Sequence, residues 1–277
     1  MVQIGKINKL PIKTIQEASI YLDGGQSGKI LLKGTQIPRN YRPDDTIDVF
    51  VYVARDQQLV ATTRRPSALV GDFAKLRVVT SSATGAFLDW GLDHDLFAPK
   101  SEQQDSMLKG RSYVVYIFLS EKNNRITASS KLHKFLGKHP PEYEEGEEVD
   151  LMIYSRTDLG YSAIVNSSHD GMIYDNEVFQ KLFIGQQLKG YIKKIREDLK
   201  IDLSLQQTGY KRVDDISQTI LNTIRNSGGK VAVTDKSPPE EIYSLFGVSK
   251  KVFKKAIGAL YKKRLIIIDA DGIKLVR

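Results

Sequence analysis

The sequence contains no cysteine, which excludes disulfide bonds, thiol catalysis and thiolate metal sites. Histidine is scarce as well. His94, His133, His139 and His169 are scattered, and none has a metal-like neighbour at helical or hairpin spacing. We therefore expect neither a metal nor any other cofactor.

Long hydrophobic runs are also missing. No apolar stretch approaches the roughly 20 residues that a membrane-spanning helix requires. The amino-terminal stretch "MVQIGKINKLPIK" lacks the apolar centre of a signal peptide. We expect a cytoplasmic protein without a membrane partner.

The sequence has no convincing catalytic motif. "GGQSGK", residues 24–29, is similar to a phosphate-binding loop, but its glycine spacing is one residue short. Ile30 stands where such a loop has the Ser or Thr that binds magnesium. The scattered Ser, His and Asp residues form no nucleophile constellation. The prediction is that the protein is not an enzyme.

Positive charge is abundant but unevenly distributed. The chain of 277 residues has a net charge of +8. Residues 141–208 are acidic, with seven cations and thirteen anions, whereas residues 209–277 have fourteen cations and seven anions. Both sections before residue 141 are basic. This asymmetry favours a polyanionic partner.

Three segments of the first 208 residues repeat one another. They are "IDVFVYVARDQQLVATTRRP" from Ile47, "YVVYIFLSEKNNRITASSKL" from Tyr113 and "LKGYIKKIREDLKIDLSLQQ" from Leu188. Each predicts a strand, a polar turn and a second strand, and three further apolar stretches precede each hairpin. Five short strands, repeated three times, predict three small closed antiparallel barrels.

Alternation within the hairpins separates an inner from an outer face. In the first copy it sends Ile47, Val49 and Val51 to one face and Phe50 to the other. The positions equivalent to Phe50 are Tyr116 and Tyr191. These outward rings could contact a ligand or pack between neighbouring barrels, and we favour packing between barrels.

After Gly209 the hydrophobic period changes from two to about 3.6, which predicts helices. The expected helices lie within residues 213–226, 237–247 and 249–264, and a terminal hairpin follows. Ser237 and Ser249 are the predicted N-caps of the second and third helices. Three helices and a hairpin are the layout of a winged helix.

The third of these helices is rich in lysine. Its predicted buried stripe consists of Phe253, Ala256, Ile257 and Leu260. The candidate residues for binding nucleic acid or a partner protein are Lys250, Lys251, Lys254 and Lys255. Lysines position a protein on phosphates but carry little sequence information, and an ordinary surface helix can also be lysine-rich. We expect contacts that are independent of base sequence.

The predicted fold class is mainly β with a C-terminal α+β domain. Three tandem five-stranded barrels are expected in residues 1–66, 67–139 and 146–208, and a winged-helix domain in residues 212–277. "PPEYEEGEEVD", residues 140–150, is expected to form an extended acidic linker between the second and third barrels.

The second repeat resembles the S1 domain, an RNA-binding barrel of the OB fold. The resemblance rests on "GAFLDWGLDHDLFAPKSEQ" followed by "LKGRSYVVYIFLSEKNNRITASS". The matching positions are Gly85, Ala86, Phe87, Leu88, Gly110, Arg125, Ile126 and Ser129. The sequence departs from the family at Ala98, where a histidine is usual.

The resemblance implies single-stranded RNA as the partner, with bases stacked on exposed rings and cations near the phosphates. The implied RNA-binding residues are Phe87, Phe97 and Arg125 in the second copy and Tyr161, Tyr174 and Lys193 in the third. The first copy retains Tyr21 at the position of Phe87 and is expected to be the poorest RNA site.

Over essentially its full length, the chain resembles the conserved virulence factor B family of bacteria. The most specific segment is "DKSPPEEIYSLFGVSKKVFKKAIGALYKK". The resemblance implies an RNA-binding regulator that controls virulence gene expression after transcription. Two alternatives stay open: a DNA-binding transcription regulator that acts through the winged helix, and a protein adaptor on RNA polymerase or the ribosome.

Overall fold

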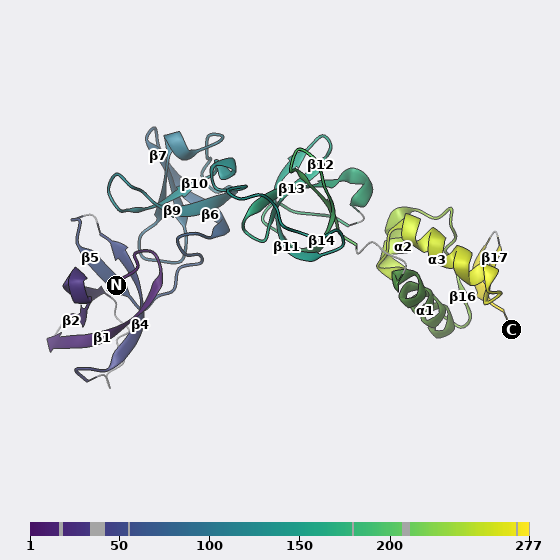
Figure 1. Ribbon diagram of the computed structural model, residues 1–277, viewed down its shortest axis with the longest axis horizontal. Coiled ribbons are helices and arrows are strands. Elements are labelled where there is room, and N and C mark those ends of the chain that lie inside the picture. The colour runs from purple at the N-terminus through teal and green to yellow at the C-terminus, as the bar shows by residue number, and fades with distance from the viewer. Residues whose placement is uncertain are drawn as a thin grey trace. The chain divides into compact units, whose positions relative to one another are not determined.

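The computed structural model describes residues 1–16, 19–33, 42–54, 56–178, 180–206, 211–269 and 271–276. The chain forms two compact units, residues 1–135 and 136–277 (Figure 1). None of the helices formed by the described residues has the length and apolar composition of a membrane span.

The first unit contains two five-stranded barrels. Barrel 1 consists of β1 (Ile7–Gln16), β2 (Ser19–Asp23), β3 (Lys29–Lys33), β4 (Thr46–Val53) and β5 (Leu59–Thr62). Barrel 2 consists of β6 (Phe73–Ser81), β7 (Gly85–Asp89), β8 (Leu96–Pro99), β9 (Ser112–Leu119) and β10 (Ile126–Ser129). The loop that is similar to a phosphate-binding loop forms only a short turn between β2 and β3, with a single 3-10 turn at Gly25–Ser27.

The second unit begins with barrel 3, which repeats the same strand order. Its strands are β11 (Glu148–Thr157), β12 (Gly160–Val165), β13 (His169–Tyr174), β14 (Gln187–Ile195) and β15 (Ile201–Ser204). In each barrel the third and fifth strands pair in parallel, and the fifth and the first both flank the fourth. This closed order is that of the OB fold, so the predicted fold class is confirmed for the barrels.

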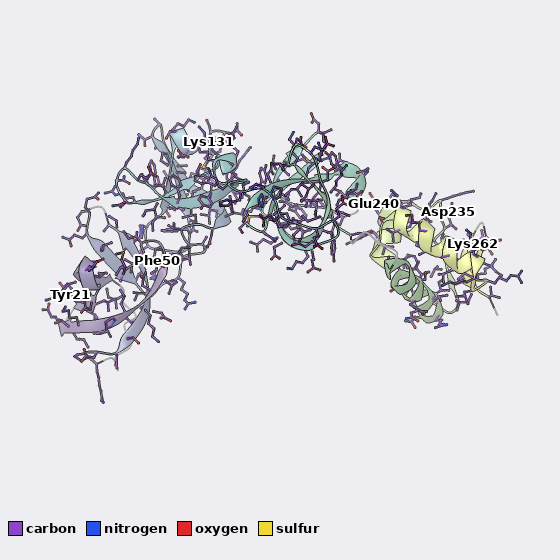
Figure 2. All side chains as sticks on the ribbon, viewed as in Figure 1. Tyr21, Phe50, Lys131, Asp235, Glu240 and Lys262 are labelled. Atoms are coloured by element: carbon purple, nitrogen blue, oxygen red, sulfur yellow. The ribbon has the colours of Figure 1, made fainter. Side chains whose placement is uncertain are left out.

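The predicted alternation of side chains is confirmed in the first hairpin. Ile47, Val49 and Val51 are buried in the core of barrel 1. Phe50 points the other way and belongs to the hydrophobic core of barrel 2. It is fully buried, and its ring lies 5.6 Å from that of Trp90 in a T-shaped arrangement (Phe50 is labelled in Figure 2).

Phe50 therefore packs between barrels, as we predicted, whereas the recorded contacts of the two equivalent rings are with residues of their own unit. Tyr116 lies against Phe73 of its own barrel and stacks on Phe135 at 4.1 Å. The hydroxyl of Tyr191 donates a hydrogen bond to Glu148 in its own barrel. Barrels 1 and 2 are also joined through the backbone, because the amide of residue 67 donates to the carbonyl oxygen of residue 90 at 2.7 Å.

The acidic segment before barrel 3 has no regular structure up to residue 147, but it is not a free spacer. Tyr143 packs against the core of barrel 3, and its hydroxyl lies 2.9 Å from Nδ1 of His169. The backbone amide of Gly146 donates to the carbonyl oxygen of Ile192. The domain boundaries given above stay predictions.

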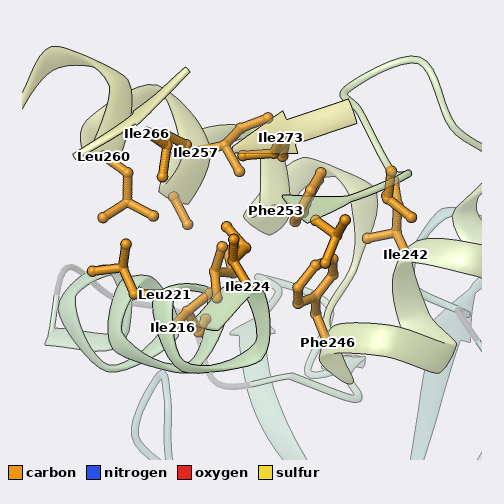
Figure 3. Packing of buried hydrophobic residues seen from close by; sticks show 14 of the residues in the cluster. Ile216, Leu221, Ile224, Ile242, Phe246, Phe253, Ile257, Leu260, Ile266 and Ile273 are labelled. Atoms are coloured by element: carbon orange, nitrogen blue, oxygen red, sulfur yellow. The ribbon is translucent and has the colours of Figure 1, made fainter. Parts of the chain in front are cut away.

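The C-terminal region has the predicted winged-helix layout. It contains α1 (Lys211–Asn226), α2 (Pro239–Phe246), α3 (Lys250–Lys262) and a sheet of β16 (Lys230–Val231), β18 (Gly272–Leu275) and β17 (Ile266–Asp269). Figure 3 shows the core, in which side chains of all three helices meet those of the sheet. The predicted buried stripe of α3 is confirmed.

One of the two predicted helix caps is wrong. Ser249 caps α3, because its hydroxyl accepts a hydrogen bond from the amide of Val252. Ser237 does not cap α2: Pro238 occupies the N-cap position, and the hydroxyl of Ser237 accepts a hydrogen bond from the amide of Thr234 instead. The pair of prolines displaces the helix start by one residue, since proline fits the first turn.

Candidate nucleic-acid interface

A groove with a volume of about 1570 Å³ runs along the first unit, from the β4–β5 hairpin of barrel 1 to the β7, β8 and β10 strands of barrel 2. Its partly exposed rings are Tyr52, Phe87, His94, Phe97, Phe118 and Phe135. Both barrels therefore contribute to a single concave surface with several aromatic rings.

Phe87 and Phe97 form an aromatic pair that lines this groove. They are direct partners on β7 and β8, and their ring centroids lie 5.0 Å apart at 41°. Ala86 and Leu88 on either side of Phe87 are fully buried, so Phe87 must face outward. The structure thus brings together the two phenylalanines that the S1 resemblance singled out.

Arg125 lines the same groove at the end of the β9–β10 turn. Its carbonyl oxygen accepts from the amide of Ser120, and its amide donates to the side chain of Asn123, which fixes the turn. Thr127, two residues later, is the parallel partner of Phe97. The three candidate residues of the second copy therefore lie in one site.

Among the described residues that line the groove, positive and negative charges are nearly balanced. Their cations are Arg64, Lys122, Arg125 and Lys134, and their carboxylates are Asp56, Asp93, Asp95, Glu102 and Glu121. Arg64 pairs with Asp93, and Lys134 lies 2.8 Å from Glu102. A polyanion would gain little net attraction here, so a ligand in this groove would be held mainly by the rings.

The groove also contains rings that the sequence interpretation did not assign to it. Tyr52 lies against His94, with ring centroids 4.4 Å apart and the rings tilted by 31°. Burial raises the pKa of Tyr52, and the charge of Asp93 raises it further. Phe118 lies beside Phe135. Alternation indicates that Tyr52 and Phe118 face outward, but no sequence signal marks His94.

Barrel 1 keeps a tyrosine at the equivalent position. Each barrel has a break in strand register, after which Thr80 pairs with Phe87 in barrel 2 and Thr14 pairs with Tyr21 in barrel 1. Tyr21 is half-buried, and its partner on β3 is Leu31 rather than a second ring. Barrel 1 therefore lacks an aromatic pair at this site.

In barrel 3 both candidate tyrosines are engaged with arginine. The guanidinium of Arg156 lies 4.5 Å from the ring centroid of Tyr161. That of Arg196 lies 5.9 Å from the ring of Tyr174 and donates to its hydroxyl. In barrel 3 the break in strand register is followed by the pair Ser155–Ser162, so Ser162 occupies the position of Phe87. Barrel 3 therefore has no equivalent of the phenylalanine pair.

Five cations of barrel 3 are paired with carboxylates of the same barrel. Nζ of Lys193, a candidate RNA contact, lies 2.6 Å from Glu177, which also accepts from the hydroxyl of Ser204. The other pairs are Arg156–Asp175, Lys189–Asp150, Arg196–Asp202 and Lys200–Asp198. The structure thus places Lys193 in an ion pair within the protein.

The four candidate lysines of α3 divide into two kinds. Lys250 donates to the carbonyl oxygen of Ser237 at 2.8 Å, and Lys254 lies 3.7 Å from Asp235. Lys251 and Lys255, one turn apart, are exposed and form no ion pair with any residue in the described part of the chain. These two lysines are the ones available to a partner.

The fold and the groove together define a protein built from tandem S1-type barrels and a winged helix, two kinds of domain that bind nucleic acids. Comparison with known families agrees: the S1 domain family matches residues 4–64, and the CvfB-like winged helix domain matches residues 218–275. The S1 match falls on barrel 1, whereas the sequence resemblance was most evident in barrel 2.

Whole-chain relatives are proteins named conserved virulence factor B. The protein from Staphylococcus epidermidis is 22% identical over 283 residues, covering 99% of this chain and 95% of the relative. The one from Staphylococcus aureus is 23% identical over 287 residues, covering 99% and 94%. The resemblance to the conserved virulence factor B family is thereby confirmed, over nearly the full length of both chains.

A solved structure from Streptococcus pneumoniae, described as a multidomain protein with nucleic acid binding domains, also aligns with the chain. The alignment covers 99% of this chain and 98% of that one, with 23% sequence identity and a TM-score of 0.43.

Proposed function

We propose that this protein is a single-stranded RNA-binding regulator whose main base-stacking site is the groove of residues 1–135. The observation that carries the proposal is the Phe87–Phe97 pair, which faces the groove beside Arg125. The family match to the S1 domain supports RNA as the ligand. The relatives' name supports a role in bacterial virulence, and the proposed RNA ligand would place that role after transcription.

Stacking would provide most of the affinity. Each base stacked on an aromatic side chain contributes roughly 1–3 kcal/mol, and part of this gain is offset by the ordering of the strand. Because the described residues of the groove include four cations and five carboxylates, we expect phosphate attraction to contribute little there. We expect micromolar affinity for a short oligomer and a shallow dependence on salt.

A second candidate function is DNA binding through the winged helix. Lys251 and Lys255 favour it, since they are exposed on the helix that many winged-helix proteins place in the major groove. This helix contains neither Asn nor Gln, the residues best suited to reading adenine. We therefore assign these lysines to phosphate contacts that are independent of base sequence.

The test is a fluorescence anisotropy titration of the full chain with labelled oligo(U) RNA, an RNA of mixed sequence and duplex DNA. We expect both RNAs to bind more tightly than the duplex. The double variant Phe87→Ala/Phe97→Ala should weaken RNA binding by about tenfold or more, since each lost stack is worth roughly 1–3 kcal/mol.

The matched control is Lys251→Ala/Lys255→Ala. It should lower the affinity for all three nucleic acids to a similar extent, and by less than the phenylalanine variant lowers the affinity for RNA. Tighter binding of duplex DNA would overturn the proposal. So would unchanged RNA binding by the phenylalanine variant, provided that its thermal unfolding shows a folded protein.

A further inference from the structure

A second polar and aromatic cluster lies in the groove where barrel 1 meets barrel 2. Arg64 from barrel 1 pairs with Asp93 from the β7–β8 loop of barrel 2. In the same groove, Tyr52 of barrel 1 lies against His94 of barrel 2, with the two rings tilted by 31°. All four side chains line the groove, and neither barrel alone contains the cluster.

The loop that carries Asp93 is held in place at several points. The indole Nε1 of Trp90 donates to the carbonyl oxygen of His94 at 2.7 Å. The amide of Gly91 donates to the side chain of Asp89. On the other side, the amide of Arg64 donates to the hydroxyl of Thr62. The cluster is therefore supported by backbone and buried groups rather than by its own ion pair.

The Arg64–Asp93 pair is open to a ligand. The side chain of Arg64 is 53% exposed and that of Asp93 is 75% exposed. Such an exposed pair contributes little to stability, so a ligand could replace its contact at little cost to folding. It offers carboxylate acceptors next to guanidinium donors, close to a pair of partly exposed rings.

One RNA base complements this arrangement on its Watson–Crick edge. Guanine presents two adjacent donors, N1–H and the N2 amino group, next to the O6 acceptor. A carboxylate can accept both donors, and a guanidinium can donate to O6. Uracil, cytosine and adenine each lack the pair of adjacent donors, so none of them can bind the carboxylate through two hydrogen bonds.

We propose that Arg64, Asp93, Tyr52 and His94 form a guanine subsite, in which Asp93 accepts from N1–H and N2–H and Arg64 donates to O6. The proposal rests on the RNA-binding function proposed above, and it adds a base preference to a groove that otherwise stacks any base. A strand in the groove would place one base on the Phe87–Phe97 pair and a guanine at the barrel junction.

The experiment compares a ten-nucleotide oligo(U) with the same oligomer carrying one central guanosine, binding to the full chain at fixed salt. A third oligomer carries inosine, which keeps N1–H and O6 but lacks the N2 amino group. A fully formed two-bond contact to a base favours that base over others by roughly five- to 150-fold. We expect about tenfold tighter binding of the guanosine oligomer, and we expect inosine to lose most of this gain.

The protein variant is Asp93→Asn, which replaces one acceptor by a donor. It should reduce the ratio of guanosine to uridine affinity from about ten to near one. The matched control is Asp105→Asn, which removes the same charge from an exposed residue outside the groove and should leave the ratio unchanged. Thermal unfolding of both variants checks that they are folded.

Equal binding of the guanosine, inosine and uridine oligomers by the unmodified chain would overturn the guanine subsite while leaving the RNA-binding proposal intact. An unchanged ratio in Asp93→Asn would overturn the assignment to this cluster. Failure of every oligomer to bind would overturn the RNA-binding proposal and the subsite with it.

Discussion

Barrels 2 and 3 share one strand order but use their charged and aromatic side chains differently. In barrel 2 the rings of Phe87 and Phe97 pair with each other and face an open groove. In barrel 3 the rings of Tyr161 and Tyr174 each lie beside an arginine, and each of these arginines is paired with an aspartate.

The difference shows that one strand topology can present quite different side chains at its surface. A cation contributes to polyanion binding only when the protein itself has not neutralised it. Barrel 3 contains Lys193 where an S1 comparison would place an RNA contact, yet Glu177 holds it. The acidic character of residues 141–208 has a structural counterpart in these internal ion pairs.

The largest expected effect concerns the buried junction of the first unit. Phe50→Ala removes a fully buried ring between two barrels and should cost about 3–5 kcal/mol of unfolding free energy. Tyr191→Ala, at the equivalent position of barrel 3, should cost only about 1 kcal/mol, since this ring is half-buried. Differential scanning calorimetry measures both, and equal losses would show that Tyr191 contributes as much to stability as the buried Phe50.

The next effect separates stacking from simple apolar contact. Phe97→Leu keeps an apolar side chain but removes the ring, so RNA affinity should fall by about 1–2 kcal/mol, roughly five- to thirtyfold. Tyr174→Leu in barrel 3 should change it less than about twofold, because that tyrosine is engaged with Arg196. Anisotropy with oligo(U) is the measurement, and a larger loss in Tyr174→Leu would reverse the ranking of the barrels.

A smaller change in RNA affinity should follow if two cations of barrel 3 lose their carboxylate partners. The double variant Asp175→Asn/Glu177→Gln frees Arg156 and Lys193 from their carboxylates. RNA affinity should rise a few-fold, and the salt dependence should steepen by about 0.7 per additional phosphate contact. The control is Glu121→Gln in the groove, where no ion pair is broken among the described residues. An unchanged salt slope in the double variant would mean that the ion pairs do not restrain binding by barrel 3.

The smallest effect concerns the pH dependence of the unfolding free energy, to which one carboxyl group in each unit should contribute with opposite sign. Burial raises the pKa of Glu102, but the hydrogen bond and charge of Lys134 outweigh this and leave the pKa below its ordinary value of 4.5. The stability that Glu102 contributes is therefore complete above pH 4.5 and is lost as the pH falls through the lower folded-state value.

Asp170 in barrel 3 should behave in the opposite way. Although the residue is exposed, its carboxylate is partly desolvated against Tyr154, and this raises its pKa above 3.8 despite the hydrogen bond from the tyrosine. Its contribution is present below pH 3.8 and is lost as the pH rises through the folded-state value. Urea unfolding at several pH values, with Glu102→Gln and Asp170→Asn as the variants, should show changes of pH slope with opposite sign.

Much of the fold could be predicted from local sequence patterns. Alternation identified the inner faces of the hairpins, and the switch to a helical period identified α1 to α3, because both signals depend on which side chains must leave water. The start of α2 was missed by one residue because Ser237 bonds to Thr234, a contact specific to this turn.

The candidate site was predicted only in part. Phe87 and Phe97 lie on neighbouring strands close in sequence, so the S1 resemblance was enough to bring them together. The engagement of Lys193 by Glu177 and the pairing of Arg64 with Asp93 join residues from separate segments. Such pairs depend on how the barrels close and meet, which no local pattern encodes.

The burial of Phe50 in the core of barrel 2 limits how this architecture can be rearranged. If recombination transferred either of the first two barrels alone to another protein, it would expose an aromatic surface to water and promote aggregation. The two barrels would have to be transferred together, in evolution or in protein engineering.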